Sequence, residues 1–141
     1  MRLEYLTSND WALLRSKSRR LSFDKGALII PVNTRPTALF ILQRGSATVE
    51  MIRGTVLARL TPGDICGEMA FVENTVASAS VIAAEPETEV EVLDLPEVTA
   101  IFSSFPHLEA RFYKSLALVL SQRLRKTSSE LVKSIADKPG T

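Results

Sequence analysis

The chain has 141 residues, of which 45% are hydrophobic and 23% are charged, and its net charge is +1. This length suffices for one hydrophobic core and is short for two, so residues 1–141 are expected to form a single domain. No apolar run approaches the ~20 residues that span a bilayer, and the N-terminus lacks the apolar core of a signal peptide. With only one cysteine, which excludes an internal disulfide, these features predict a cytoplasmic protein outside the membrane.

The charged residues are distributed unevenly along the chain. Residues 1–60 contain ten basic and four acidic side chains, residues 61–110 contain ten acidic and no basic ones, and residues 111–141 contain seven basic and two acidic ones. An anion bound at the middle segment would therefore need its counter-charge from elsewhere in the fold or from backbone dipoles.

Residues 1–20 are expected to form an N-terminal helical segment. Thr7 stands three residues before Asp10, as in a capping box, and an apolar run follows. A short amphipathic helix over about 8–18 is therefore predicted. The basic residues at its end are interpreted as a solvated helix terminus rather than a nucleic-acid contact: Lys17, Arg19 and Arg20.

Residues 21–95 change to a strand-like pattern of short apolar runs separated by glycine, proline and asparagine. The runs lie at 27–30, 38–42, 47–51, 56–60, 80–83 and 88–94. Closely spaced strands with such turns predict a mainly β fold with flanking helices, an antiparallel β-roll or double-stranded jelly roll.

Pro96 begins a second helical region, expected over 96–135, with a long helix from about 107 to 135. Apolar residues recur on one face of that helix, which is too long for a compact roll to cover. Its distal half is a candidate homodimer seam or lid, or a contact surface for an output protein. Residues 136–141 are expected to be a frayed tail.

Enzymatic sites are not favoured by the residues present. The only histidine is His107, so neither a histidine-based metal site nor a histidine base beside a nucleophile can be built. Cys66 has no neighbouring cation and is expected to be a small buried side chain. We therefore expect a non-enzymatic protein without a metal or cofactor.

The most specific pattern lies in residues 67–81. Gly67 and the small residues after it allow a ligand to approach the backbone closely, and Glu68 offers a carboxylate to sugar hydroxyls. The candidate ligand-binding residues are Gly67, Glu68, Met69, Ala70, Ala77, Ser78, Ala79 and Ser80.

These residues resemble the phosphate-binding cassette of the cyclic nucleotide-binding domain family, which includes the effector domains of catabolite-activator-like and protein-kinase regulatory proteins. The resemblance continues through the glycine motifs Asp24-Lys25-Gly26, Gln43-Arg44-Gly45 and Pro62-Gly63-Asp64. It implies a regulatory domain for cAMP or cGMP in which Glu68 holds the ribose 2′-hydroxyl. The family's phosphate-binding arginine falls on Ala77.

The alanine at position 77 predicts weakened or altered ligand binding, because a charge-assisted hydrogen bond is typically worth about 1.5–3 kcal/mol. Six other arginines are candidate substitutes, and the sequence favours none of them: Arg35, Arg44, Arg53, Arg59, Arg123 and Arg125. The alternative is a degenerate module for protein interaction or dimerisation that binds no cyclic nucleotide. No DNA-binding domain is expected, since about six residues follow Ile135.

Overall fold

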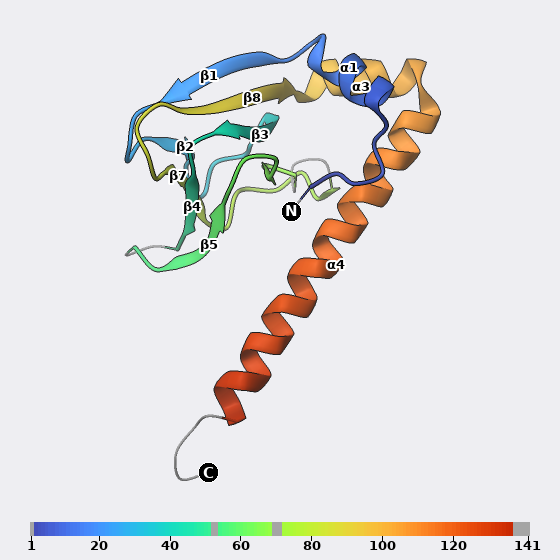
Figure 1. Cartoon of the computed structure of the whole chain (residues 1–141). Coiled ribbons are helices and arrows are strands. Elements are labelled where there is room, and N and C mark those ends of the chain that lie inside the picture. The colour runs from blue at the N-terminus through green and yellow to red at the C-terminus, as the bar shows by residue number, and fades with distance from the viewer. Residues whose placement is uncertain (1, 52–53, 69–71, 137–141) are drawn as a thin grey trace.

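The computed structural model describes residues 2–51, 54–68 and 72–136. Within them, two four-stranded antiparallel sheets form a roll, and helices cover one side of it (Figure 1). One sheet has the order β1 (Arg19–Phe23), β8 (Thr88–Asp94), β3 (Ala38–Arg44) and β6 (Ile65–Cys66). The other has the order β2 (Leu28–Ile30), β7 (Ser80–Ala83), β4 (Ala47–Glu50) and β5 (Val56–Leu60). The predicted antiparallel β-roll is confirmed.

Strands β3 and β8 serve two hydrophobic cores at once. Successive side chains of a strand point to opposite faces of the sheet. Leu39 of β3 and Leu93 of β8 therefore pack against the helices, whereas Leu42, Val90 and Val92 fill the space between the sheets. This double burial explains why the apolar pattern of both strands is nearly continuous.

The helices are α1 (Ser8–Arg15), α3 (Leu95–Ser104) and α4 (Pro106–Ala136). The predicted capping box starts α1: the Thr7 side chain accepts from the Asp10 N–H, and the Asp10 carboxylate accepts from the Thr7 N–H. Among the described helices, none has both the length and the apolar character needed to cross a bilayer.

The expected solvated helix end is wrong for Arg19 and Arg20, although Lys17 is exposed in the turn after α1. Helix α1 ends at Arg15, and Arg19 and Arg20 lie in β1, beside the acidic strand β8. Arg19 pairs with Asp94 at 3.2 Å, and Arg20 pairs with Glu89 at 3.2 Å. Cross-strand attraction between opposite charges favours this strand pairing, so part of the acidic middle segment is neutralised here.

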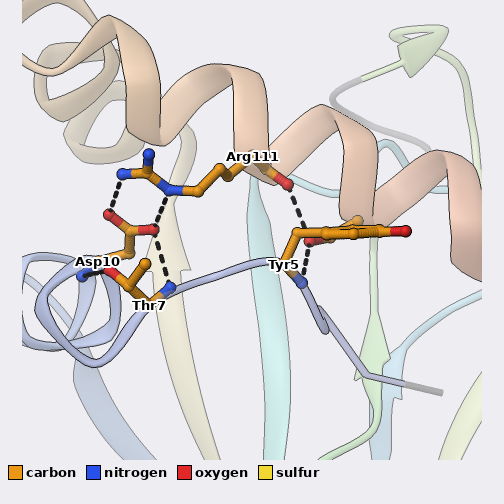
Figure 2. Close-up of polar contacts among 5 residues, drawn as sticks. Tyr5, Thr7, Asp10 and Arg111 are labelled. Carbon is orange, nitrogen blue, oxygen red and sulfur yellow. Dashed lines mark hydrogen bonds and ion pairs between the residues drawn. The ribbon is translucent and has the colours of Figure 1, made fainter.

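An ion pair fastens the N-terminal segment to α4 (Figure 2). Asp10 is only 3% exposed, and its two carboxylate oxygens accept from Nε and a terminal nitrogen of Arg111 at 2.6 and 2.7 Å. Nearby, the Tyr5 N–H donates to Ser115 Oγ, which donates to the Arg111 carbonyl (Figure 2). The hydrogen bond from Arg111 lowers the pKa of Asp10 to about 2, against the opposing effect of burial.

Helix α4 is anchored in its first half and exposed in its second. Leu108, Phe112, Leu116 and Val119 are buried in the core between helices and sheet. Beyond the half-buried Leu120, large apolar side chains on α4 are strongly exposed, including Leu124 at 68%, Leu131 at 61% and Ile135 at 59%. Figure 1 shows the last turns of α4 extending past the roll.

The substitution Asp10→Asn should lower the free energy of unfolding by about 1.5–3 kcal/mol at neutral pH, because it removes the charge that two Arg111 hydrogen bonds require. The folded-state pKa of Asp10, about 2, lies below its ordinary value of 3.8. The stabilisation is therefore present above pH 3.8 and is lost as the pH falls toward 2. Urea unfolding of both proteins across this range measures the difference.

The matched control is Glu87→Gln, since Glu87 faces Arg44 at 3.8 Å with both side chains more than two-thirds exposed. An exposed pair of this kind contributes little, so the control should change stability by less than about 0.5 kcal/mol. A loss on Asp10→Asn that is equally small, or that does not shrink at low pH, would contradict the assigned role.

Candidate functional site

A cavity of about 1070 Å³ lies between the β2-β7-β4-β5 sheet, the segment after β5 and helix α4. Val49, Ala58 and Val81 form part of its floor, and they are aligned across three paired strands. Residues 75–79 form another wall. Because it has both apolar and charged walls, the cavity suits a ligand with an apolar body and polar groups.

Gly67 is required by the backbone at the cavity wall. Its φ is +83°, and a Cβ atom at this position would lie 2.7 Å from the Ala38 carbonyl oxygen. Any other residue would therefore be strained as well as crowded. The tight passage beside β3 places the next residue, Glu68, directly on the cavity.

Glu68 is almost buried, at 4% exposure, and it forms an ion pair with Arg123 of α4. Arg123 also donates to the Ile65 carbonyl at 3.4 Å. The carboxylate that the sequence assigns to a sugar hydroxyl is thus already bonded to a cation from the long helix. An ionised carboxylate has about four lone-pair directions, so Glu68 retains capacity for a further O–H donor.

The backbone N–H and carbonyl of Ala77 are both hydrogen-bonded to the loop between β2 and β3. Its N–H donates to the Thr34 carbonyl at 2.8 Å, and its own carbonyl accepts from the Asn33 N–H at 2.8 Å. Ser80 Oγ likewise accepts from the Val32 N–H at 2.9 Å. These amides and carbonyls close one end of the cavity, and an anion there would need other partners.

The structure brings five of the predicted residues to the cavity: Gly67, Glu68, Ala77, Ser78 and Ala79. Ser80 instead holds the loop before β3 through its hydroxyl. Met69 and Ala70 lie outside the described residues, as does Arg53 among the candidate substitute cations.

Helix α4 contributes cavity residues that sequence reasoning missed. Arg123 was one of several candidate cations, but Lys126, Thr127 and Glu130 also line the cavity and were not predicted to do so. Their spacing of three, four and seven residues from Arg123 places all of them on one helix face. This polar face is the sequence signal that could have identified them as cavity residues.

Cys66 lines the same cavity in β6, next to Gly67. Burial, with the nearby Glu68 carboxylate, raises the pKa of the Cys66 thiol. A thiol in this state is a poor nucleophile at neutral pH. Among residues 2–51, 54–68 and 72–136, no group of three or more histidine, cysteine, aspartate or glutamate side chains could hold a metal ion.

A family model described as cyclic nucleotide-binding domain matches residues 20–105. Cyclic GMP-binding protein C of Dictyostelium discoideum is 28% identical over 125 residues, which cover 85% of this chain and 5% of that protein. Glutaminase 1 of Bradyrhizobium diazoefficiens is 33% identical over 122 residues, covering 86% of this chain and 20% of that protein. The chain therefore corresponds to a small part of the curated relatives that it matches.

Solved structures share the fold. The catabolite activator protein of Thermus thermophilus is 27% identical with a TM-score of 0.74, and the match covers 92% of this chain and 60% of that one. A cyclic nucleotide-binding domain from Methylobacillus flagellatus is 20% identical with a TM-score of 0.82, covering 92% of this chain and 74% of that one.

The Glu68–Arg123 pair predicts a measurable coupling between the roll and α4. Removing one partner leaves a buried or half-buried charge unpaired, whereas removing both does not. A double-mutant cycle with Glu68→Gln and Arg123→Gln should give a coupling energy of about 1–2 kcal/mol in urea unfolding, reduced by the partial exposure of Arg123.

Arg125→Gln is the matched control, because Arg125 lies on the same helix, is exposed and does not line the cavity. Its coupling to Glu68→Gln should be close to zero. Equal coupling for both arginines would show that the effect is general charge rather than the ion pair.

Proposed function

The chain belongs to the cyclic nucleotide-binding domain family, and we propose that it is a non-enzymatic regulatory domain that binds cAMP or cGMP in the cavity beneath α4. In this proposal the nucleotide is a ligand and not a cofactor. We also propose that residues 1–141 act as one domain, in which the roll holds the ligand and residues 96–135 transmit its presence.

The observation that carries the proposal is the nearly buried Glu68 on the cavity wall, bonded to Arg123 of α4. A ribose 2′-hydroxyl can donate to the same carboxylate that Arg123 binds. The ligand and the helix would therefore interact with one group. A ligand that binds more strongly when Arg123 is in one position shifts the population of α4 toward that position.

Position 77 is the reason for expecting reduced affinity. Ala77 lines the cavity, and its backbone N–H and carbonyl are both hydrogen-bonded to residues 33 and 34. Neither its side chain nor its amide would neutralise a phosphate. Loss of one charge-assisted contact of about 1.5–3 kcal/mol weakens binding by roughly ten- to a hundredfold.

Two relatives support including cyclic GMP among the ligands tested. Cyclic GMP-binding proteins C and D of Dictyostelium discoideum match this chain, and their printed names specify cyclic GMP. Each corresponds to this chain over only 5–6% of its length. The whole-protein activities of these relatives are therefore not carried over.

A second candidate function is a degenerate module for dimerisation or protein interaction. The exposed apolar side chains of α4 favour it, because Leu124, Leu131 and Ile135 lie close together on one side of the helix. In that case the Glu68–Arg123 pair would only hold α4 in place, and the cavity would bind no cyclic nucleotide.

Calorimetric titration with cAMP and cGMP should show measurable affinity for at least one of them, and Glu68→Ala should abolish it, because the ribose would lose its acceptor. Glu68→Ala must be compared at equal folded fraction, since it also removes the Arg123 partner. Silence of the wild type up to millimolar ligand would sink the proposal.

Ala77→Arg distinguishes the two functions, with Ala77→Gln as a control that adds length without charge. For a binding domain of reduced affinity, Ala77→Arg should strengthen binding by about tenfold or more, and Ala77→Gln should not. Binding created by Ala77→Arg where the wild type had none would favour the degenerate module. Tight binding by the wild type would refute that alternative.

The degenerate module also predicts self-association through the distal half of α4. Sedimentation at 10–100 µM protein, taken as a rough working range for interfaces of modest size, should show a dimer that Leu124→Ser with Leu131→Ser disrupts. Lys133→Ser on the same helix should leave it intact. A wild type that remains monomeric throughout would contradict a dimer seam on this face.

A further inference from the structure

At the end of the cavity near Ala77, a cyclic phosphate would need a positive counter-charge. Ala77 brings no cation, and the acidic side chains Glu73 and Asp64 also line the cavity. An anionic group in a partly enclosed site is stable only with a nearby opposite charge or several hydrogen-bond donors. A phosphate at this end would therefore need a basic residue that the fold places near Ala77.

The loop between β2 and β3 is joined directly to Ala77. Two backbone hydrogen bonds of 2.8 Å connect residues 33 and 34 to Ala77, and the Val32 N–H donates to Ser80 at 2.9 Å. Asn33 and Pro36 of this loop line the cavity. Arg35 lies between them, one residue from the Thr34 carbonyl that accepts from Ala77.

The backbone of this loop is held in a defined shape. Pro31 and Pro36 restrict its φ angles, Thr34 Oγ1 donates to the Pro31 carbonyl at 2.6 Å, and Asn33 makes the turn with φ of 64°. The Cα of Arg35 is therefore fixed near the cavity, while its exposed side chain is free to change rotamer. Among the described residues, none forms an ion pair with Arg35.

The other basic residues near the cavity are less suitably placed to bind a phosphate beside Ala77. Arg123 is paired with Glu68 at the sugar end of the cavity, and Lys126 precedes the acidic Glu130 by one helical turn. Arg59 also lines the cavity, but it lies in β5, at the opposite edge of the sheet from β2, and Ala77 is joined to the loop that follows β2. Arg44 faces Glu87.

We propose that Arg35 provides the counter-charge for the cyclic phosphate, so that a guanidinium from the β2–β3 loop replaces the one absent at position 77. This inference rests on the proposed binding of a cyclic nucleotide. A guanidinium can donate two parallel hydrogen bonds to the two free oxygens of the cyclic phosphate. Arg35 thus acts as a ligand-binding residue that rotates inward from solvent when the anion is present.

The test compares cyclic nucleotides with the matching nucleosides, which lack the phosphate. Wild type, Arg35→Gln and Arg44→Gln are titrated calorimetrically with cAMP, cGMP, adenosine and guanosine. Arg35→Gln should weaken cyclic nucleotide binding by about tenfold or more and leave nucleoside binding unchanged. Arg44→Gln, an exposed arginine away from the cavity lining, should change neither.

A second measurement excludes an indirect effect on the loop. In the Ala77→Arg background the new guanidinium takes the phosphate, so adding Arg35→Gln should cost much less affinity than it does in the wild type. If the wild type binds cyclic nucleotide and Arg35→Gln binds it equally well, the assignment of Arg35 is overturned while the proposed function stands. If the wild type binds neither cyclic nucleotide, both are overturned.

Discussion

The ion pair between Glu68 and Arg123 connects the roll to helix α4. Glu68 is fixed by the roll, because Gly67 passes against the Ala38 carbonyl and leaves no freedom in where the next residue emerges. Arg123 is fixed by α4, whose first half is buried against the sheet. A nearly buried carboxylate requires a partner, and Arg123 of α4, which crosses the cavity, supplies one.

A second ion pair makes that arrangement possible. Asp10 and Arg111 hold the start of α4 against α1, and the Tyr5–Ser115 hydrogen bond adds a contact one turn further along. With its first half fastened in this way, α4 has few directions in which its exposed second half can extend. The N-terminal segment therefore positions cavity residues that are more than a hundred residues away in the chain.

Charge balance follows the same principle of long-range pairing. The charged side chains of residues 61–110 are all acidic. Acidic side chains of β8 nevertheless pair with arginines of β1, and Glu68 pairs with Arg123 of α4. The basic residues that do this come from the two ends of the sequence. The fold thus brings charges that are far apart in the sequence together as local ion pairs. At its end of the cavity, Ala77 contributes no charge to such a pair.

The sequence by itself determined the roll, the capping box of α1 and the long helix, because each depends on local periodicity, turn residues or spacing within a few residues. It did not reveal β6, which has two residues and too little pattern to detect, nor β1, whose arginines form diagonal ion pairs with Asp94 and Glu89 of the neighbouring strand β8. The partner of Glu68, the cavity face of α4 and the hydrogen bonds that join Ala77 to the β2–β3 loop were decided only by tertiary structure. Each of these contacts joins residues more than forty positions apart, and no local preference specifies which distant side chain meets them.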